Sequence, residues 1–172
     1  MNTSQLRRVA SRHRRVGPVF AGVFASDELP KKATNKAYII NLDPSNKRGS
    51  HWISIYFHPE KNAATYFDPY GLKPKSLNII RFLRRNAMFK TYNRKVYQSP
   101  CSFVCGEYAL YHLYHQANGL PLSVLDRHFH PMTKRNNDRK VVRFVKKHFN
   151  GHTEHPYVDQ NCLNQTSQAL LA

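Results

Sequence analysis

The segment from Glu107 to Asn118 is apolar on nearly every side. Its apolar residues precede a turn sequence, Asn-Gly-Leu-Pro, and they are Tyr108, Ala109, Leu110, Tyr111, Leu113 and Tyr114. A helix that is hydrophobic all round has to be enclosed by other elements, and a glycine just after the last turn is a common helix stop. We therefore expect a central helix packed against a sheet, with the rest of the chain arranged around it.

A cysteine lies where the preceding turn becomes this helix. The turn reads Gln-Ser-Pro-Cys-Ser-Phe-Val-Cys-Gly from Gln98 to Gly106, so that Cys105 directly precedes the glycine. The first amides of a helix have no partner within it and the macrodipole favours an anion there, so a thiol at this position ionises more easily. Because free cysteines are often simply buried, a role as nucleophile requires a base and a carboxylate elsewhere.

A hairpin is predicted to supply both groups. Residues 51–57 are typical of a strand, residues 59–62 of a turn and residues 63–68 of the partner strand. A loop centred between positions 59 and 60 sets His51 opposite Asp68, and paired residues have Cβ atoms about 4.5 to 5.5 Å apart. Ordinary explanations exist as well, since Asp68 begins a type I turn sequence and His51 is a polar residue at a strand entrance. The sequence alone does not fix the register.

Together the three residues form a pattern suited to acyl transfer. Cys105 supplies a thiolate nucleophile, His51 takes and returns the proton, and Asp68 holds the imidazole in the useful tautomer. The hypothesis depends on the hairpin end and the helix start meeting in space.

Three further residues are expected to complete such a site. Gln98 ends a strand that leads into the cysteine loop, where its amide can complete an oxyanion hole with the backbone N–H of Cys105. Gly106 has no side chain to keep a substrate carbonyl away. Trp52, next to the histidine, is expected to be a core or cleft-wall residue.

A metal site is the competing use of the same residue types. Cys101, Cys105, His112 and His115 could be read as a ligand set, but the two histidines have two residues between them rather than three to five. On a helix the last of these histidines also turns partly away from the cysteine. We predict no metal site and no organic cofactor.

The remaining elements follow from hydrophobic spacing in a chain of 172 residues, a length that favours one domain, residues 1–172. We expect a basic helical segment over residues 1–16, strands over 36–42 and 91–97, and an irregular polar tail over 151–172.

Two more helices are expected, each with one apolar face. Residues 76–88 have Leu77, Ile80 and Leu83 at helical spacing beside several arginines. Asp138 is expected to cap a last basic helix. The apolar residues turned inward from that helix are Val141, Val142, Phe144, Val145 and Phe149.

The charge balance is strongly basic. The chain has 27 Lys plus Arg against 10 Asp plus Glu, a formal net charge of +17. Such an excess favours a polyanionic partner such as nucleic acid, and without a zinc-finger or RNP signature we expect non-specific phosphate contacts rather than base readout. The candidate nucleic-acid-binding residues are Arg7, Arg8, Arg81, Arg84, Arg85, Lys134, Arg135, Arg139 and Lys140.

Cysteine usage and hydropathy bear on the compartment. Cys101, Cys105 and Cys162 are an odd number and too few for a disulfide framework, so we expect reduced thiols in an intracellular compartment. No apolar stretch is long enough to predict a membrane span, and no apolar segment follows the N-terminal arginines to predict a signal peptide.

Short motifs then occur in a specific order. They are Gly49-Ser50-His51-Trp52, Tyr66-Phe67-Asp68-Pro69-Tyr70-Gly71, Gln98-Ser99-Pro100 and Val104-Cys105-Gly106, with Gly17 to Phe24 and, more weakly, Pro131 to Asn136. This combination resembles the adenovirus-type cysteine endopeptidases, the adenain family, which shares a clan with SUMO-specific proteases. The resemblance implies an α+β cysteine-protease fold in which a central helix bearing the nucleophile packs on a mixed β-sheet.

The resemblance also implies roles and partners. His51 is then the general base, Asp68 the orienting carboxylate, Gln98 the oxyanion donor and Cys105 the nucleophile of a viral maturation protease. Its substrates would be viral structural precursor proteins cut after Gly-containing motifs, in the virion and the host nucleus. DNA and a short activating peptide would stimulate it, and we expect a monomer.

The chain departs from the family pattern at two points. Asp68 stands where adenoviral enzymes commonly have Glu, and no cysteine occurs where those enzymes link to their activating peptide. Cys101 and Cys162 have no assigned role. Two alternatives stay open: a protease that removes a ubiquitin-like modifier of the SUMO type, and a non-catalytic basic nucleic-acid-binding protein with a protease-like fold.

Overall fold

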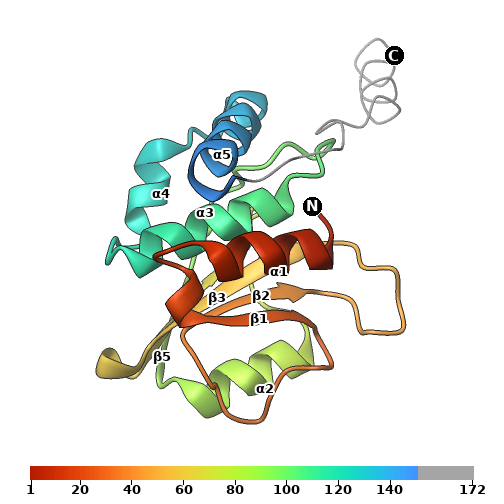
Figure 1. Ribbon diagram of the computed structural model, residues 1–172, viewed down its shortest axis with the longest axis vertical. Helices are drawn as coiled ribbons and strands as arrows, with labels where there is room; N and C mark the ends of the chain where they lie inside the picture. Colours follow the sequence, from red (N-terminus) through yellow and green to blue (C-terminus); the bar gives the residue numbers. More distant parts are fainter. Residues whose placement is uncertain (151–172) are drawn as a thin grey trace.

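A five-stranded mixed sheet organises the part of the chain that the structure, a computed structural model, describes, residues 1–150 (Figure 1). The strands lie in chain order across the sheet: β1 (Phe20–Ala25), β2 (Ala37–Asn41), β3 (Trp52–His58), β4 (Ala63–Phe67) and β5 (Phe89–Tyr92). The three central strands are antiparallel, and each outer strand runs parallel to its neighbour. The predicted α+β class with a mixed sheet is confirmed.

Helices cover both faces of this sheet. They are α1 (Thr3–Arg12), α2 (Leu77–Asn86), α3 (Cys105–Ala117), α4 (Ser123–His128) and α5 (Lys134–Phe149), with short 3-10 turns at Gly17–Val19 and Pro59–Lys61. Helices α1 and α3 pack on one face, where α5 lies over α3, and α2 packs on the other (Figure 1). Among the described residues, none of the helices is long and apolar enough to cross a bilayer.

Helix α3 is the centre of the fold, as its composition predicts. Eleven of its 13 residues are buried, including the polar His112. Leu110 and Leu113 join a core with α1, α5 and the sheet, while Tyr108 and Tyr111 join a second core with α4 and α5. With neighbours on every side, the helix holds its first residue, Cys105, in one position.

The predicted role of Gly106 in substrate approach is not what its geometry indicates. A Cβ atom on this glycine would lie 3.1 and 3.3 Å from the two methyl carbons of Leu6, a fully buried residue of α1. The missing side chain therefore allows α1 to pack closely against the start of α3. The space it leaves is filled by a protein side chain and not by a substrate.

The predicted hairpin forms, but in a different register. His58 pairs with Ala63, because the loop is the four-residue segment 59–62, in which Asn62 has a left-handed backbone with φ of 46°. Continued past the strand ends, this register faces His51 with Tyr70 instead of Asp68. The shift is two residues, and since side chains alternate faces along a strand, His51 and Asp68 still lie on the same face.

Of the three apolar residues predicted for the inner face of α2, Leu83 is buried, but Leu77 and Ile80 are not. Ile79, Phe82 and Leu83 are buried against the sheet, whereas Leu77 is 65% exposed and Ile80 only half-buried. Both stripes fit the helical repeat, and the one containing the aromatic ring fills the core beneath Tyr38.

Two other boundaries differ from prediction. The strand expected over residues 91–97 ends at Tyr92, since the chain turns there to bring Asn93 onto the end of β4. The last helix begins at Lys134, after Thr133, so Asp138 lies inside it as a buried acceptor rather than as its cap.

Other elements predicted from the sequence are present in the structure. The basic N-terminal helix and the strand within residues 36–42 are present, while β1 and α4 had not been predicted from hydrophobic spacing. The residues expected on the inner face of α5 are buried, with Phe144 half-buried. The predicted tail, 151–172, and Cys162 lie outside the described residues.

The α2 register generates a stability prediction. Leu83→Ala should lower the free energy of unfolding by about 2–4 kcal/mol, because it opens a cavity against the sheet. Leu77→Ala, the same change on the same helix, should cost less than about 0.5 kcal/mol, because that side chain is mostly in water. Urea denaturation followed by circular dichroism measures both, and equal losses would contradict the observed register.

Candidate active site

The ends of β3 and β4 bring His51 and Asp68 together. Nε2 of His51 lies 2.8 Å from Oδ1 of Asp68. The carboxylate is fully buried, and the histidine is 9% exposed. The structure thus makes the predicted contact, although by a diagonal approach across the hairpin end instead of the directly opposed pairing.

Asp68 is fixed in place by groups that the sequence did not reveal. Its Oδ1 also accepts a hydrogen bond of 2.8 Å from the backbone N–H of Tyr70, within the turn that follows β4. The side chain of Asn93 accepts from the backbone N–H of Asp68 at 2.9 Å and donates to its carbonyl oxygen at 2.5 Å. The side chain of Asn93 thereby extends the hydrogen bonding between β4 and β5 past the end of the two strands. It fixes the backbone of Asp68, so the carboxylate has little freedom to move.

The electrostatics of this pair favour a charged imidazole. Burial lowers the pKa of His51, but hydrogen bonds to Asp68 and Cys105, together with the negative charges of both groups, outweigh burial and raise this pKa to about 9 from an ordinary 6.5. The ring of Tyr70 stacks on the imidazole with a centroid separation of 4.8 Å, which restricts its rotation. Because Asp68 takes Nε2, the nitrogen left for the thiol is Nδ1.

Cys105 is the first residue of α3 and the free cysteine of the described part of the chain. It is 9% exposed and lies against the histidine, to which it is hydrogen-bonded. A thiol in this position can pass its proton to the imidazole, and the helix N-terminus favours the thiolate that results.

Gln98 lies in the loop before α3, and its side-chain amide makes one hydrogen bond. Its Nε2 donates to the carbonyl oxygen of Ser102 at 2.7 Å. Since a carbonyl only accepts, this contact fixes the orientation of the amide and leaves the second N–H for another acceptor. The residue is 1% exposed, and its Oε1 has no hydrogen-bond partner among the described residues.

Asp138 of α5 supports this loop from behind. The backbone N–H of Ser99 donates to its carboxylate at 3.3 Å, and the hydroxyl of Tyr108 on α3 donates to it at 3.1 Å. Burial raises the pKa of Asp138 to about 6, although hydrogen bonds from neighbouring groups act in the opposite direction. This carboxylate connects the loop, α3 and α5, a function that its position in the sequence gave no reason to expect.

A cleft of about 560 Å³ opens over these groups. His51, Trp52, Tyr70, Gln98, Phe103 and Cys105 contribute to its lining. Trp52 therefore lies where a cleft wall was expected, and the ring of Phe103, 58% exposed, forms part of the lining close to Cys105. An extended peptide laid in this cleft would pass over the cysteine.

The metal alternative finds no support among residues 1–150, where no cluster of three His, Cys, Asp or Glu side chains could hold an ion. Nδ1 of His112 lies 2.8 Å from the hydroxyl of Ser54, and Nδ1 of His115 lies 2.8 Å from the carbonyl oxygen of Tyr111. Both histidines serve the packing of α3 instead.

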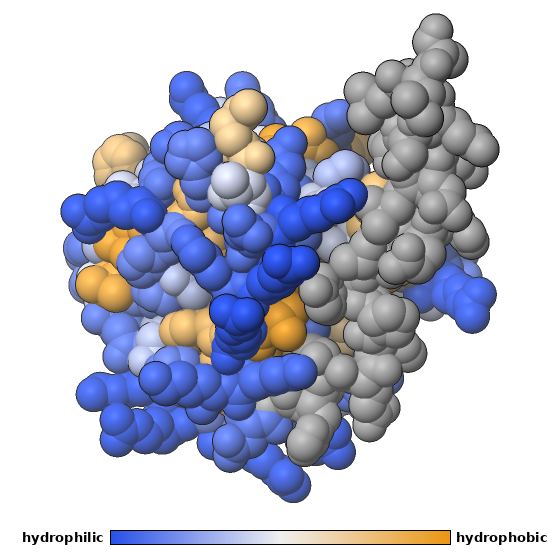
Figure 2. Space-filling model, turned by 90° about the horizontal axis from the view of Figure 1, so that it is seen from above, coloured by the Kyte–Doolittle hydropathy of each residue, from blue (hydrophilic) through white to orange (hydrophobic). Residues whose placement is uncertain are grey.

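The basic residues are spread over separate surfaces. Arg81, Arg84 and Arg85 lie on α2, beneath the sheet, whereas the basic residues of α5 lie on the other side of the molecule (Figure 1). The face that carries α5 is largely hydrophilic (Figure 2). Arg7 donates to the carbonyl oxygen of Val23 and is thus partly engaged in the fold. One rigid duplex could not contact all the predicted residues at once.

Comparisons with known proteins agree with this geometry. The family described as adenovirus endoprotease matches residues 20–157. A protease of bovine adenovirus C serotype 10 is 31% identical over 59% of this chain, and the match spans 60% of that relative's length. A protease of bovine adenovirus B serotype 3 is 24% identical over 77% of this chain and 81% of its own. The solved ASFV pS273R protease is similar in fold, with a TM-score of 0.61 at 15% identity, over 86% of this chain and 66% of that one.

The raised pKa of His51 generates a prediction. In Asp68→Asn the imidazole loses its charged partner while burial stays, so its pKa should fall from about 9 toward or below the ordinary 6.5. NMR titration of the His51 ring protons measures both values.

Cys105→Ala is the matched comparison, because it removes the other group that raises this pKa and should lower it as well. A His51 titration unchanged in Asp68→Asn would contradict the assigned electrostatics.

Proposed function

We propose that this chain, which belongs to the adenovirus endoprotease family of cysteine proteases, is an active endopeptidase that cleaves precursor proteins by acyl transfer at Cys105. One observation carries the proposal: a single imidazole, that of His51, is hydrogen-bonded both to a buried carboxylate and to a cysteine at a helix start. In this arrangement a base takes the proton of a thiol and later returns it.

The first chemical step uses the thiolate of Cys105. It attacks the scissile carbonyl carbon, a C–S bond forms, and the carbonyl π electrons move onto oxygen. When the tetrahedral intermediate collapses, the imidazolium of His51 gives its proton to the leaving amine and a thioester remains. Water then attacks the thioester with His51 as base, and release of the carboxylic acid restores the thiolate. Asp68 keeps Nε2 of His51 occupied throughout, so Nδ1 faces the reacting atoms.

The oxyanion is held by two N–H groups in this proposal. One is the backbone amide of Cys105, and the other is the second N–H of Gln98, whose first N–H is fixed by Ser102. A buried amide with an unused donor and an unpaired Oε1 costs free energy, on the order of 1–3 kcal/mol. The proposed role gives a reason for that cost, because the donor is already aimed when charge develops on the substrate.

The relatives support a viral assignment, since two of them are proteases of bovine adenoviruses. We assign this chain, as substrates, precursor proteins of a virus or virus-like element, cut at Gly-containing motifs in the virion or host nucleus. Trp52 and Phe103 line the same cleft as Cys105 and would contact the substrate residues beside the cut bond.

DNA is proposed as an activator, and a short peptide as a second one. The net charge of +17 supports a polyanionic partner. The exposed basic residues of α5, including Arg139 and Lys140, lie on the same side of the sheet as the arginines of α1, so we assign DNA to this side rather than to α2.

Substitutions in the site test the function. Cys105→Ala should abolish cleavage of a fluorogenic peptide library containing Gly motifs, and His51→Ala should do nearly as much. Asp68→Asn should reduce kcat/KM by about 10²–10⁴-fold, because the imidazole loses its orientation. His130→Ala, an exposed histidine away from the cleft, is the control and should keep full activity. Cleavage retained by Cys105→Ala would refute the proposal.

Salt dependence tests the DNA proposal. Binding of a short duplex, measured by fluorescence anisotropy, should weaken at least about tenfold between 50 and 200 mM salt, because phosphate contacts release counterions. Arg139→Gln with Lys140→Gln should weaken it further, whereas Arg81→Gln with Arg84→Gln should change it little. A flat salt response, or equal losses in the two double variants, would count against DNA on the α5 side.

A further inference from the structure

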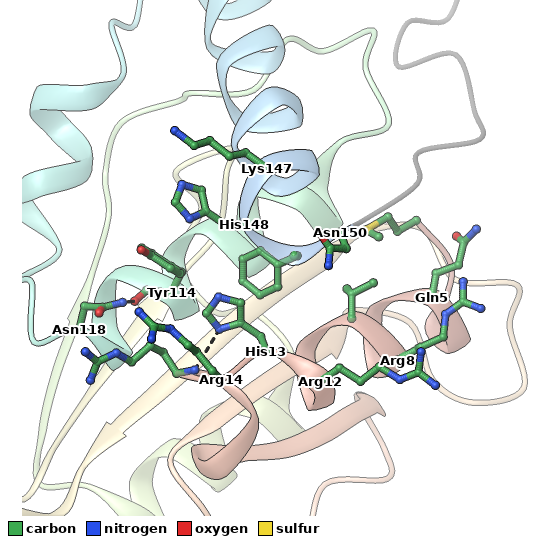
Figure 3. A pocket seen from close by; sticks show the side chains of 14 residues that line it. Gln5, Arg8, Arg12, His13, Arg14, Tyr114, Asn118, Lys147, His148 and Asn150 are labelled. Carbon is green, nitrogen blue, oxygen red and sulfur yellow. Dashed lines mark hydrogen bonds between the residues drawn. The ribbon is translucent and has the colours of Figure 1, made fainter.

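A second hollow lies apart from the cysteine, between α1, the end of α3 and the last turn of α5 (Figure 3). Its volume is about 650 Å³, against about 560 Å³ for the cleft over Cys105. Ligand pockets typically measure about 300–1,000 Å³, so this hollow has the size of a small-molecule site. Its only residue shared with the catalytic cleft is Met1.

The lining of this α1–α5 pocket is strongly cationic. Its full positive charges are Arg8, Arg12, Arg14, Arg15 and Lys147. No Asp or Glu is among the described residues that line it, and none of these five cations has an ion-pair partner within 4.0 Å in the described part of the chain. The pocket thus gathers positive charge without internal compensation.

Helix dipoles offset only part of this charge. Three helix C-termini converge on the pocket, those of α1, α3 and α5, and each is equivalent to roughly half a negative charge. Their sum is about −1.5, whereas the lining carries five full positive charges. An excess of about 3.5 positive charges remains, and an anion is what would balance it.

Two histidines add donors to the lining. Nδ1 of His13 accepts the backbone N–H groups of Arg15 and Val16, each at 3.2 Å, so a neutral ring carries its proton on Nε2, which has no partner among the described residues. The imidazole of His13 packs against the ring of Phe149 with a centroid separation of 4.3 Å, and this contact restricts rotation of the imidazole. Figure 3 shows His13 and His148 on adjacent walls of the pocket, with Tyr114 between them.

The surroundings of both histidines lower their pKa values. Burial, the neighbouring His148 and Arg14 lower the pKa of His13, and burial and Lys147 lower the pKa of His148. The charged side chains that line the pocket with them are all cationic, so an anion in the pocket would raise both pKa values. Binding would then take up protons and tighten as the pH falls.

We propose that the α1–α5 pocket binds a compact anion that carries several phosphate groups. Arginine side chains bind phosphate oxygens in pairs, which suits the four guanidinium groups of the lining. An open hollow of about 650 Å³ has room for a small polyphosphate, whereas a duplex could insert no more than part of its backbone. The proposal does not rest on the assignment of the catalytic residues, because binding is measured directly.

Calorimetry with inositol hexakisphosphate as the probe tests the pocket. Arg12→Gln with Arg14→Gln should weaken binding at least about tenfold, because it removes two charge-assisted contacts. Arg81→Gln with Arg84→Gln removes the same charge from α2 and should weaken binding less than about threefold, by long-range electrostatics alone. All four side chains are exposed, so the fold should persist, which the urea midpoint checks.

Two further measurements identify the source of the ligand and the contribution of the two histidines to binding. Affinity should rise from pH 7.5 to pH 6. If a short duplex displaces the probe and binds the Arg12/Arg14 variant more weakly, the phosphates that the pocket binds are those of DNA. If the duplex binds alongside the probe, the natural ligand is a free polyphosphate. Equal weakening in both double variants, or no binding of the probe by the wild-type chain, would overturn the proposal.

Discussion

The burial of α3 is the constraint on which the rest of the structure depends. Leu110 and Leu113 are fully buried, and each such side chain contributes roughly 1.5–3 kcal/mol when it is removed from water. The sheet covers one side of the helix, α5 covers the opposite side, and α1 lies beside it on the sheet. Cys105 is the first residue of this enclosed helix, so the packing that stabilises the fold also fixes where the sulfur lies. The hairpin end with His51 then has to meet it.

The charge state of His51 follows from a competition between burial and two anionic partners. Its pKa of about 9 against 6.5 in an unfolded chain corresponds to a free energy on the order of 3 kcal/mol. Because the folded pKa is the higher one, this stabilisation is fully present below about pH 6.5 and is lost as the pH rises through about 9. Asn93 and Tyr70 support the pair by fixing the carboxylate and the ring. The same contacts that stabilise the fold near neutral pH therefore hold the imidazole in its charged, oriented form.

Much of the fold and the meeting of His51, Asp68 and Cys105 could be predicted from the sequence, because those features depend on periodicity. A two-residue error in hairpin register keeps side chains on the same face, so the predicted contact survived it. Asn93 could not be found in this way, since its bonds reach the backbone of a residue 25 positions away and leave no local pattern. Spacing along the sequence does not encode the shape of neighbouring elements. That shape decides which apolar side chains of α2 are buried, and it decides which element a Cβ atom on Gly106 would meet.

The central claim is that His51 activates Cys105 as a nucleophile. The rate at which iodoacetamide alkylates Cys105, followed by the mass of the modified peptide, tests this claim without any substrate or activator. At pH 6, where the imidazole is charged, wild-type Cys105 should react at least about tenfold faster than Cys105 in His51→Ala, because the charged ring stabilises the thiolate. Equal rates in the two proteins would contradict the account.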